Sequence, residues 1–139
     1  MAKRIRVIGL GRFGGALAET AQAEGVEVVA IDNQMFAIDA LKDKVAHAVC
    51  LDATDVEALR GVDATRCDVA VVAMGESFES SVLCVNALKE LGIREIHARA
   101  HDARQAKILR AIGATEVIEI ETDFGRRIGK ALARGSDKK

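Results

Sequence analysis

Short runs of apolar residues alternate along this chain with longer stretches in which apolar residues recur every third or fourth position. The short runs are rich in valine, isoleucine and alanine, and they predict β-strands at residues 5–8, 27–31, 46–51, 68–74, 95–100 and 116–120. The longer stretches have helical periodicity and predict helices at residues 13–24, 34–44, 55–60, 76–91, 103–112 and 123–133. This alternation predicts an α/β fold, a Rossmann-like doubly wound sheet of six mainly parallel strands.

The same pattern identifies a central strand and an amphipathic last helix. Residues 69–74 are all apolar, as expected of a central parallel strand that is covered by helices on both faces. In the last predicted helix, Phe124, Ile128 and Leu132 recur every fourth position and form an apolar stripe. That stripe has two readings: it packs on the domain's own sheet, or it packs on another protein chain.

A glycine-rich loop joins the first predicted strand to the first predicted helix. Residues 9–14 read GLGRFG, which matches the G-x-G-x-x-G dinucleotide-binding pattern in the strand-to-helix context that the pattern requires. Gly9 permits the tight turn, Gly11 lets the backbone approach a pyrophosphate, and Gly14 lets the helix pack closely on the strand. The amides and the dipole at the helix start then attract phosphate groups.

An acidic residue, Asp32, ends the second predicted strand, where the dinucleotide pattern has one. Its carboxylate can accept hydrogen bonds from both ribose hydroxyls and would repel a 2′-phosphate. Asn33 and Gln34 follow it and supply no cation, so NAD, ATP or ADP fits better than NADP. The alternative reading is a glycine turn followed by a helix-capping aspartate.

Further candidates follow the other predicted strands, at the sheet edge where such folds bind ligands. Asp52 and Thr54 are placed to reach the adenine side, or else cap the next helix, with Thr54 as the expected cap. Met74 belongs either to the site or to the core, and Arg12 either binds phosphate or is solvated. The full candidate set for cofactor binding is Gly9, Gly11, Arg12, Phe13, Gly14, Asp32, Asn33, Asp52, Ala53, Thr54, Ala73, Met74, Gly75 and Arg99.

Composition and charge narrow the class of protein. The chain has 139 residues and a formal net charge of −1, without the basic stripe of a nucleic-acid-binding domain. The longest apolar run is too short to span a bilayer and the start has no apolar signal region, so we expect a cytoplasmic protein. The three cysteines form no CxxC pair, so we expect buried small side chains rather than a zinc site or disulfides.

No catalytic set of side chains is evident. His47, His97 and His101 are scattered, and we expect ordinary polar residues of loops and strands. A dehydrogenase needs a substrate pocket and proton-transfer groups, usually on a second domain. A binding domain without enzymatic activity is therefore favoured, and the alternative is a cofactor-binding fragment of an NAD-dependent oxidoreductase.

Several segments resemble the RCK family, also called KTN or TrkA-N, whose members regulate potassium channels and transporters. Residues 5–14, IRVIGLGRFG, resemble the opening of that domain. LDATD at 51–55 is similar to the family's GDATD, ARA at 98–100 to its ARA, and GATEVI at 113–118 to its GADxVI. The resemblance covers nearly the whole chain and predicts a TrkA-N domain at residues 1–134, followed by a disordered tail at 135–139.

The resemblance implies a regulatory role at the inner face of the cell membrane. Such domains bind ATP and ADP, or NAD and NADH, and form homodimers and rings that gate potassium flux through a membrane subunit. It implies that Arg12 and Arg99 lie near phosphates, Asp32 contacts the ribose, and residues 52–54 contact the nucleoside. Glu121 would hold a divalent cation near the terminal phosphate, unless it is simply a solvated glutamate.

Two further expectations come from the end of the chain. The resemblance implies that the last helix is a crossover helix, which swaps onto a partner domain. Family members usually continue into a C-terminal regulatory domain, so this chain is expected to be either a truncated or a naturally short form.

Overall fold

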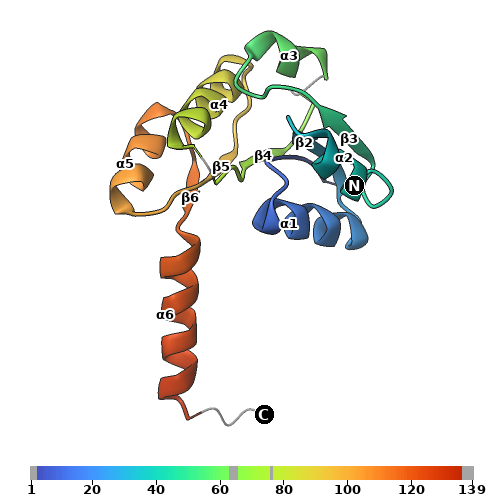
Figure 1. Ribbon diagram of the computed structural model, residues 1–139. Helices are drawn as coiled ribbons and strands as arrows, with labels where there is room; N and C mark the ends of the chain where they lie inside the picture. Colours follow the sequence, from blue (N-terminus) through green and yellow to red (C-terminus); the bar gives the residue numbers. More distant parts are fainter. Residues whose placement is uncertain (1–2, 63–65, 76, 136–139) are drawn as a thin grey trace.

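The computed structural model describes residues 3–62, 66–75 and 77–135 (Figure 1). Within these residues six strands form one sheet in the order β3-β2-β1-β4-β5-β6, and every neighbouring pair is parallel. The strands are β1 (Arg4–Ile8), β2 (Glu27–Asp32), β3 (His47–Cys50), β4 (Val69–Val72), β5 (Ile96–Arg99) and β6 (Glu116–Ile118). The predicted Rossmann-like α/β sheet is confirmed, and it is wholly rather than mainly parallel.

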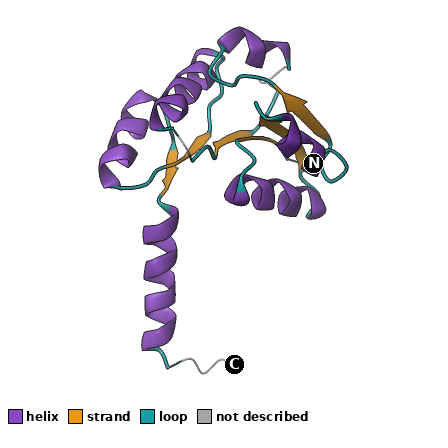
Figure 2. Ribbon diagram, in the orientation of Figure 1, coloured by secondary structure: helices purple, strands orange, loops and turns teal. Residues whose placement is uncertain are grey.

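Helices cover both faces of this sheet (Figure 2). The helices of the described residues are α1 (Arg12–Ala23), α2 (Met35–Leu41), α3 (Val56–Gly61), α4 (Phe78–Glu90), α5 (Ala103–Ile112) and α6 (Ile120–Ala133), of which α6 does not pack on the sheet. α1 and α2 pack on one face, and α3, α4 and α5 contribute to the core on the other. Neighbouring residues of β1 show the alternation, because Val7 belongs to the first core and Ile8 to the second. Burial on both faces explains why the central strands are continuously apolar.

The strand order reverses at β1, which has β2 on one side and β4 on the other. Such a switch point leaves a crevice at the carboxyl ends of the strands, because the helices that follow β1 and β4 leave the sheet on opposite faces. The glycine-rich loop lies at this point, since it follows β1 directly. The topology therefore places the main candidate loop beside the crevice.

One boundary error concerns the end of the domain. We expected a strand through residue 120 and a helix from residue 123, but β6 ends at Ile118 and α6 begins at Ile120. The Asp123 carboxylate accepts a hydrogen bond from the Glu119 amide, and the Asp123 amide donates to the Glu119 carbonyl. The Asp123 side chain thereby holds the residue that precedes α6, and acidic residues in the first turn favour the same start.

Several smaller expectations are also corrected. The observed strands β3 and β4 and the helices α2 and α4 are shorter than expected. Only Cys84 is buried, whereas Cys50 is exposed and Cys67 is half-buried. Three expectations fall outside the described residues: the start of the fourth helix at Glu76, the first two residues of the expected domain, and residues 136–139 of the expected tail.

α6 projects away from the rest of the domain (Figure 1). None of its residues is buried, and Phe124 and Leu132 on its apolar stripe are 56% and 70% exposed. Packing of this stripe on the domain's own sheet is therefore wrong for this chain. No helix within the described ranges is both long and apolar enough to cross a membrane.

Candidate functional site

A cavity of about 510 Å³ opens at the carboxyl edge of the sheet, at the switch point. Its wall comes from the ends of β1, β2 and β5, from the residues that follow β1, β2, β3 and β4, and from the starts of α2 and α4. The predicted residues that line it are Gly9, Gly11, Asp32, Asn33, Asp52, Ala53, Thr54, Ala73, Met74, Gly75 and Arg99. Segments far apart in sequence thus meet in one place.

Four predicted residues lie outside that wall. Arg12 is exposed as the first residue of α1, Phe13 is half-buried behind it, and Gly14 is buried. Glu121 is exposed in the first turn of α6. Across residues 3–62, 66–75 and 77–135, no group of three or more His, Cys, Asp or Glu side chains is placed to hold a metal ion. The cation role of Glu121 stays a prediction.

The three glycines of the loop differ in what surrounds them. Gly9 has a φ of 95°, and a Cβ there would lie 2.7 Å from the Met74 amide nitrogen. A Cβ on Gly14 would overlap the Gly9 carbonyl oxygen and lie 3.2 Å from the Ala73 Cβ. A Cβ on Gly11 would meet no heavy atom within 4 Å. Gly9 and Gly14 are therefore needed for folding, whereas Gly11 borders open space.

The Asp32 side chain, at the end of β2, accepts hydrogen bonds from the glycine loop and from the start of α2. Its Oδ2 accepts a hydrogen bond of 2.8 Å from the Leu10 amide, and its Oδ1 accepts one of 2.9 Å from the Gln34 amide. Each carboxylate oxygen has two lone pairs, so both can accept a further hydrogen bond from a ligand. Asp32 therefore has a structural role in the turn and is also positioned at the cavity.

Asp52 and Thr54 form a local unit on the opposite wall. Asp52 Oδ1 accepts hydrogen bonds from the Thr54 hydroxyl at 2.6 Å and the Thr54 amide at 3.0 Å. These bonds stabilise the ionised carboxylate, so they lower the pKa of Asp52 below its ordinary value. Thr54 does not cap α3 as we expected. The cap is Asp55, whose side chain accepts from the Glu57 amide, because Asp55 directly precedes the helix.

Arg99 lies between the glycine loop and the residues after β4. Its Cζ is 5.9 Å from the centroid of the Phe13 ring, and its guanidinium packs against Gly75. His101 Nε2 lies 3.2 Å from the Gly75 carbonyl oxygen. His97 instead pairs with Glu95 at 2.8 Å. Of the two histidines, His101 is therefore the one that contacts the cavity wall.

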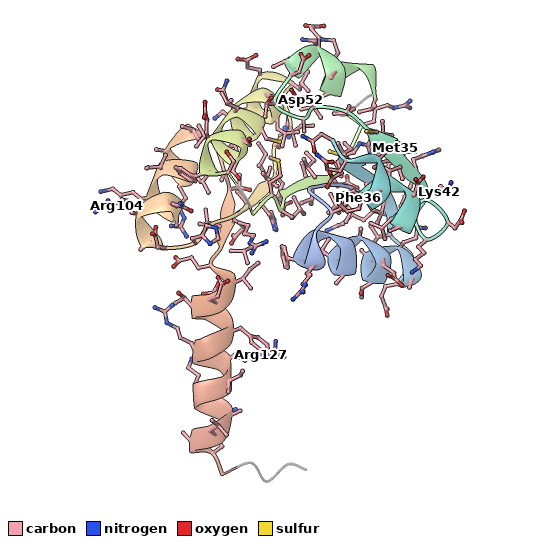
Figure 3. All side chains as sticks on the ribbon, viewed as in Figure 1. Met35, Phe36, Lys42, Asp52, Arg104 and Arg127 are labelled. Atoms are coloured by element: carbon pink, nitrogen blue, oxygen red, sulfur yellow. The ribbon has the colours of Figure 1, made fainter. Side chains whose placement is uncertain are left out.

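Sequence reasoning missed part of the cavity wall, namely Ile8, Leu10, Gln34, Phe36, Ala37, Leu51, Ser77 and Ser80. Phe36 stands out because it is 75% exposed and lies in the first turn of α2 (Figure 3). Ser77 caps α4 by accepting a hydrogen bond from the Ser80 amide. The sequence carried a signal for Ser77, since serine before an apolar helix is a typical cap. An aromatic residue soon after Asp32, at the start of the next predicted helix, was the available signal for Phe36.

The parallel sheet and the switch-point cavity define a Rossmann-like domain. The chain belongs to the TrkA-N family, because the family model of the TrkA-N domain matches residues 5–120. The predicted family is thereby confirmed.

Curated relatives carry the same domain within longer chains. The Ktr system potassium uptake protein C of Bacillus subtilis is 38% identical over 92% of this chain and 58% of its own length. The Ktr system potassium uptake protein A of the same organism is 34% identical, over 94% of this chain and 59% of its own length. The chain thus spans a little under three fifths of each of these relatives.

Solved structures share the fold. The TrkA-N domain of the inner membrane protein ybaL from Escherichia coli has a TM-score of 0.81 and 22% identity, over 95% of this chain and 98% of that one. The GsuK channel bound to NAD has a TM-score of 0.79 and 16% identity, over 93% of this chain and 23% of that one. At these identities, the likeness concerns the fold alone.

Proposed function

We propose that this chain is a nucleotide-binding regulatory domain of a potassium channel or transporter, and that its cavity binds ATP and ADP, or NAD and NADH. The observation that carries the proposal is the convergence of Gly11, Asp32 and Arg99 on one cavity at the switch point. Gly11 leaves its backbone accessible to a ligand, Asp32 supplies a carboxylate that accepts hydrogen bonds, and Arg99 supplies a positive charge. A phosphorylated nucleoside has a matching group for each of them.

The cavity has room for such a ligand. Its volume of about 510 Å³ falls within the roughly 300–1,000 Å³ of small-molecule sites. Phosphates would lie over Gly11 at the start of α1, where the helix dipole favours negative charge, with Arg99 as a counter-charge. The ribose would lie at Asp32, which leaves Phe36 and residues 52–54 to border the base. The negative charge of Asp32 would disfavour a 2′-phosphate there.

The relatives supply the regulatory part of the proposal. Two of them are potassium uptake proteins by name, and the GsuK structure is of a channel bound to NAD. By this analogy, the domain acts at the inner face of the membrane through a membrane subunit and is not an enzyme. Turnover of a nicotinamide cofactor with a small alcohol or acid would instead favour the alternative, a cofactor-binding fragment of an oxidoreductase.

A second copy of the chain is the proposed partner of α6. The helix exposes Phe124, Ile128 and Leu132 on one stripe, and burying such side chains stabilises by about 1.5–3 kcal/mol each. A crossover of α6 onto a second domain would bury them and form a homodimer, from which a ring can be built. Glu121 would then be carried toward the second copy, which is the arrangement that its predicted cation role requires.

Gating then requires the ligands to bind two states of the assembly unequally, because a ligand shifts an equilibrium only by its differential affinity. ATP and ADP differ in their phosphates, so this pair can supply that difference through Arg12 and Arg99. The domain would thus convert the identity of the bound nucleotide into a change of shape.

A ligand panel tests the proposal directly. Purified protein is titrated with ATP, ADP, AMP, NAD, NADH and NADP by calorimetry, and the melting temperature is measured with each ligand. We expect saturable binding of the adenine nucleotides, with NADP weaker than NAD. Absence of binding by every member of the panel would refute the proposed function.

A further inference from the structure

The aromatic ring of the glycine loop contacts a cavity arginine without lining the cavity itself. Phe13 is the second residue of α1 and is absent from the cavity wall, whereas Arg99 at the end of β5 is part of it. The Arg99 Cζ lies 5.9 Å from the centroid of the Phe13 ring, which is within cation–π range. The ring therefore contacts the guanidinium while leaving the ligand space free.

Gly75 leaves room for the same guanidinium. A Cβ on Gly75 would lie 2.9 Å from Arg99 Nη1 and 3.2 Å from Arg99 Cζ. Gly75 is not one of the glycines with a positive φ, so its backbone conformation does not itself require glycine. A Cβ there would instead displace the Arg99 guanidinium from its observed position. His101 Nε2, 3.2 Å from the Gly75 carbonyl oxygen, adds a polar contact to this peptide.

We propose that Phe13 is a positioning residue: together with Gly75, it holds the Arg99 guanidinium in the cavity wall, ready to meet the anionic phosphates of the ligand. This inference rests on the proposed function for the identity of the ligand. Phe13 was a candidate for direct cofactor binding, and the geometry assigns it an indirect role instead.

The physical basis is preorganisation. A free arginine side chain loses rotamer freedom when it closes on a phosphate, and that loss weakens binding. A guanidinium already held against an aromatic face has lost part of that freedom before the ligand arrives. Leucine at position 13 would fill much of the same volume but offers no aromatic face, so Phe13→Leu separates packing from positioning.

The first test needs no ligand. Ring currents from Phe13 should shift the Arg99 Nε–Hε signal in NMR spectra of the wild-type protein. Phe13→Leu should remove that shift, and Phe13→Tyr, which keeps the aromatic face, should retain it. Phe78→Leu is a matched control, because Phe78 is also half-buried but does not line the cavity. An Arg99 signal that is unchanged in Phe13→Leu would overturn the proposal.

The second test measures phosphate recognition by calorimetry with ADP and adenosine. Phe13→Leu should weaken ADP binding about two- to thirtyfold, the range of a cation–π contact, and leave adenosine binding unchanged. In an Arg99→Gln background, Phe13→Leu should have no further effect on ADP, since the residue it positions is gone.

Two results would overturn the positioning role. One is that Phe13→Leu weakens the binding of ADP and of adenosine equally. The other is that the effects of Phe13→Leu and Arg99→Gln on ADP binding are fully additive. Each would mean that Phe13 acts independently of Arg99. The failure of the proposed function looks different, because wild-type protein would then bind no member of the nucleotide panel. Wild-type protein that binds ADP, with Phe13→Leu binding it equally well, would overturn the positioning role alone.

Discussion

Substituting alanine for Gly11 should weaken ligand binding while leaving the fold intact. A Cβ at this position meets no heavy atom within 4 Å, and the φ of Gly11 is −73°, which alanine adopts readily. Alanine is a poorer residue than glycine at a helix N-cap, by roughly 0.5–1 kcal/mol. It also reduces the entropy of the unfolded chain, which stabilises by about 0.4–1 kcal/mol. The two contributions offset each other, so the free energy of unfolding should change little.

The expected loss of ligand binding arises because the added methyl group would occupy the open space beside Gly11. If phosphates approach the backbone at Gly11, a methyl group there forces them outward and disrupts one charge-assisted hydrogen bond. Such a bond contributes about 1.5–3 kcal/mol, so the dissociation constant should rise roughly 10- to 150-fold. Calorimetry with the best ligand of the panel measures this ratio, and thermal unfolding without ligand measures the fold.

Gly14→Ala and Gly15→Ala are the matched controls. The Gly14 Cβ would overlap the Gly9 carbonyl oxygen, and overpacking of this kind costs about 1–3 kcal/mol or more. The Gly15 Cβ would lie 3.5 Å from the Leu10 carbonyl oxygen, an ordinary contact, and alanine favours the helix by about 1 kcal/mol. Gly11→Ala protein that melts like wild type and also binds like wild type would refute the reasoning, because the ligand would then not approach this loop.

Three other changes test separate parts of the molecule. Asp32→Asn removes the charge that opposes a 2′-phosphate, so the preference for NAD over NADP should shrink by about 1–3 kcal/mol in calorimetry; an unchanged preference would remove Asp32 from ligand selection. Phe124→Asp should weaken a homodimer by about 3–6 kcal/mol, because one buried side chain is lost from each copy, and light scattering should then show monomers. Phe36→Asp, a control at another exposed phenylalanine on α2, should leave the mass unchanged; unchanged mass for Phe124→Asp would refute the crossover. Burial raises the pKa of the Cys84 thiol to about 12 from an ordinary value of 9.0, so the unfolded chain loses this proton at a lower pH than the folded protein does. The contribution of the neutral thiol to stability is therefore fully present below pH 9 and is lost as the pH rises toward 12. The free energy of unfolding of Cys84→Ala should therefore fall less steeply above pH 9, and parallel curves for the two proteins would contradict this.

The sheet and the glycine loop were predictable because local sequence determines them. Continuous apolar runs identify strands that are buried on both faces, and the spacing of Gly9, Gly11 and Gly14 after such a run identifies the turn into α1. Parallel strands place their carboxyl ends at one edge, so the meeting of Asp32 with Gly75 and Arg99 followed from the topology. Side-chain contacts between segments were needed only to predict individual helix caps, residue exposures and side-chain pairs.

Those details were where sequence reasoning failed. The capping roles of Thr54 and Asp55 could not be separated, because both residue types cap helices and they are adjacent. The exposure of Cys50 depends on β3 lying at the edge of the sheet, which the sequence of that strand does not encode. The contact between Phe13 and Arg99 joins α1 to β5, and no local pattern predicts a pair so far apart in the chain.

α6 shows how the fold and the proposed assembly depend on each other. A helix of 14 residues is close to the length at which isolated helices are only marginally stable in water. Most helical stability in proteins comes from burying an apolar face, yet α6 buries none of its residues within the part of the chain that the structure describes. Its stripe of Phe124, Ile128 and Leu132 therefore leaves apolar side chains in water that a partner surface would cover. Under the proposed crossover, dimerisation supplies that surface and fixes where Glu121 lies relative to a second cavity.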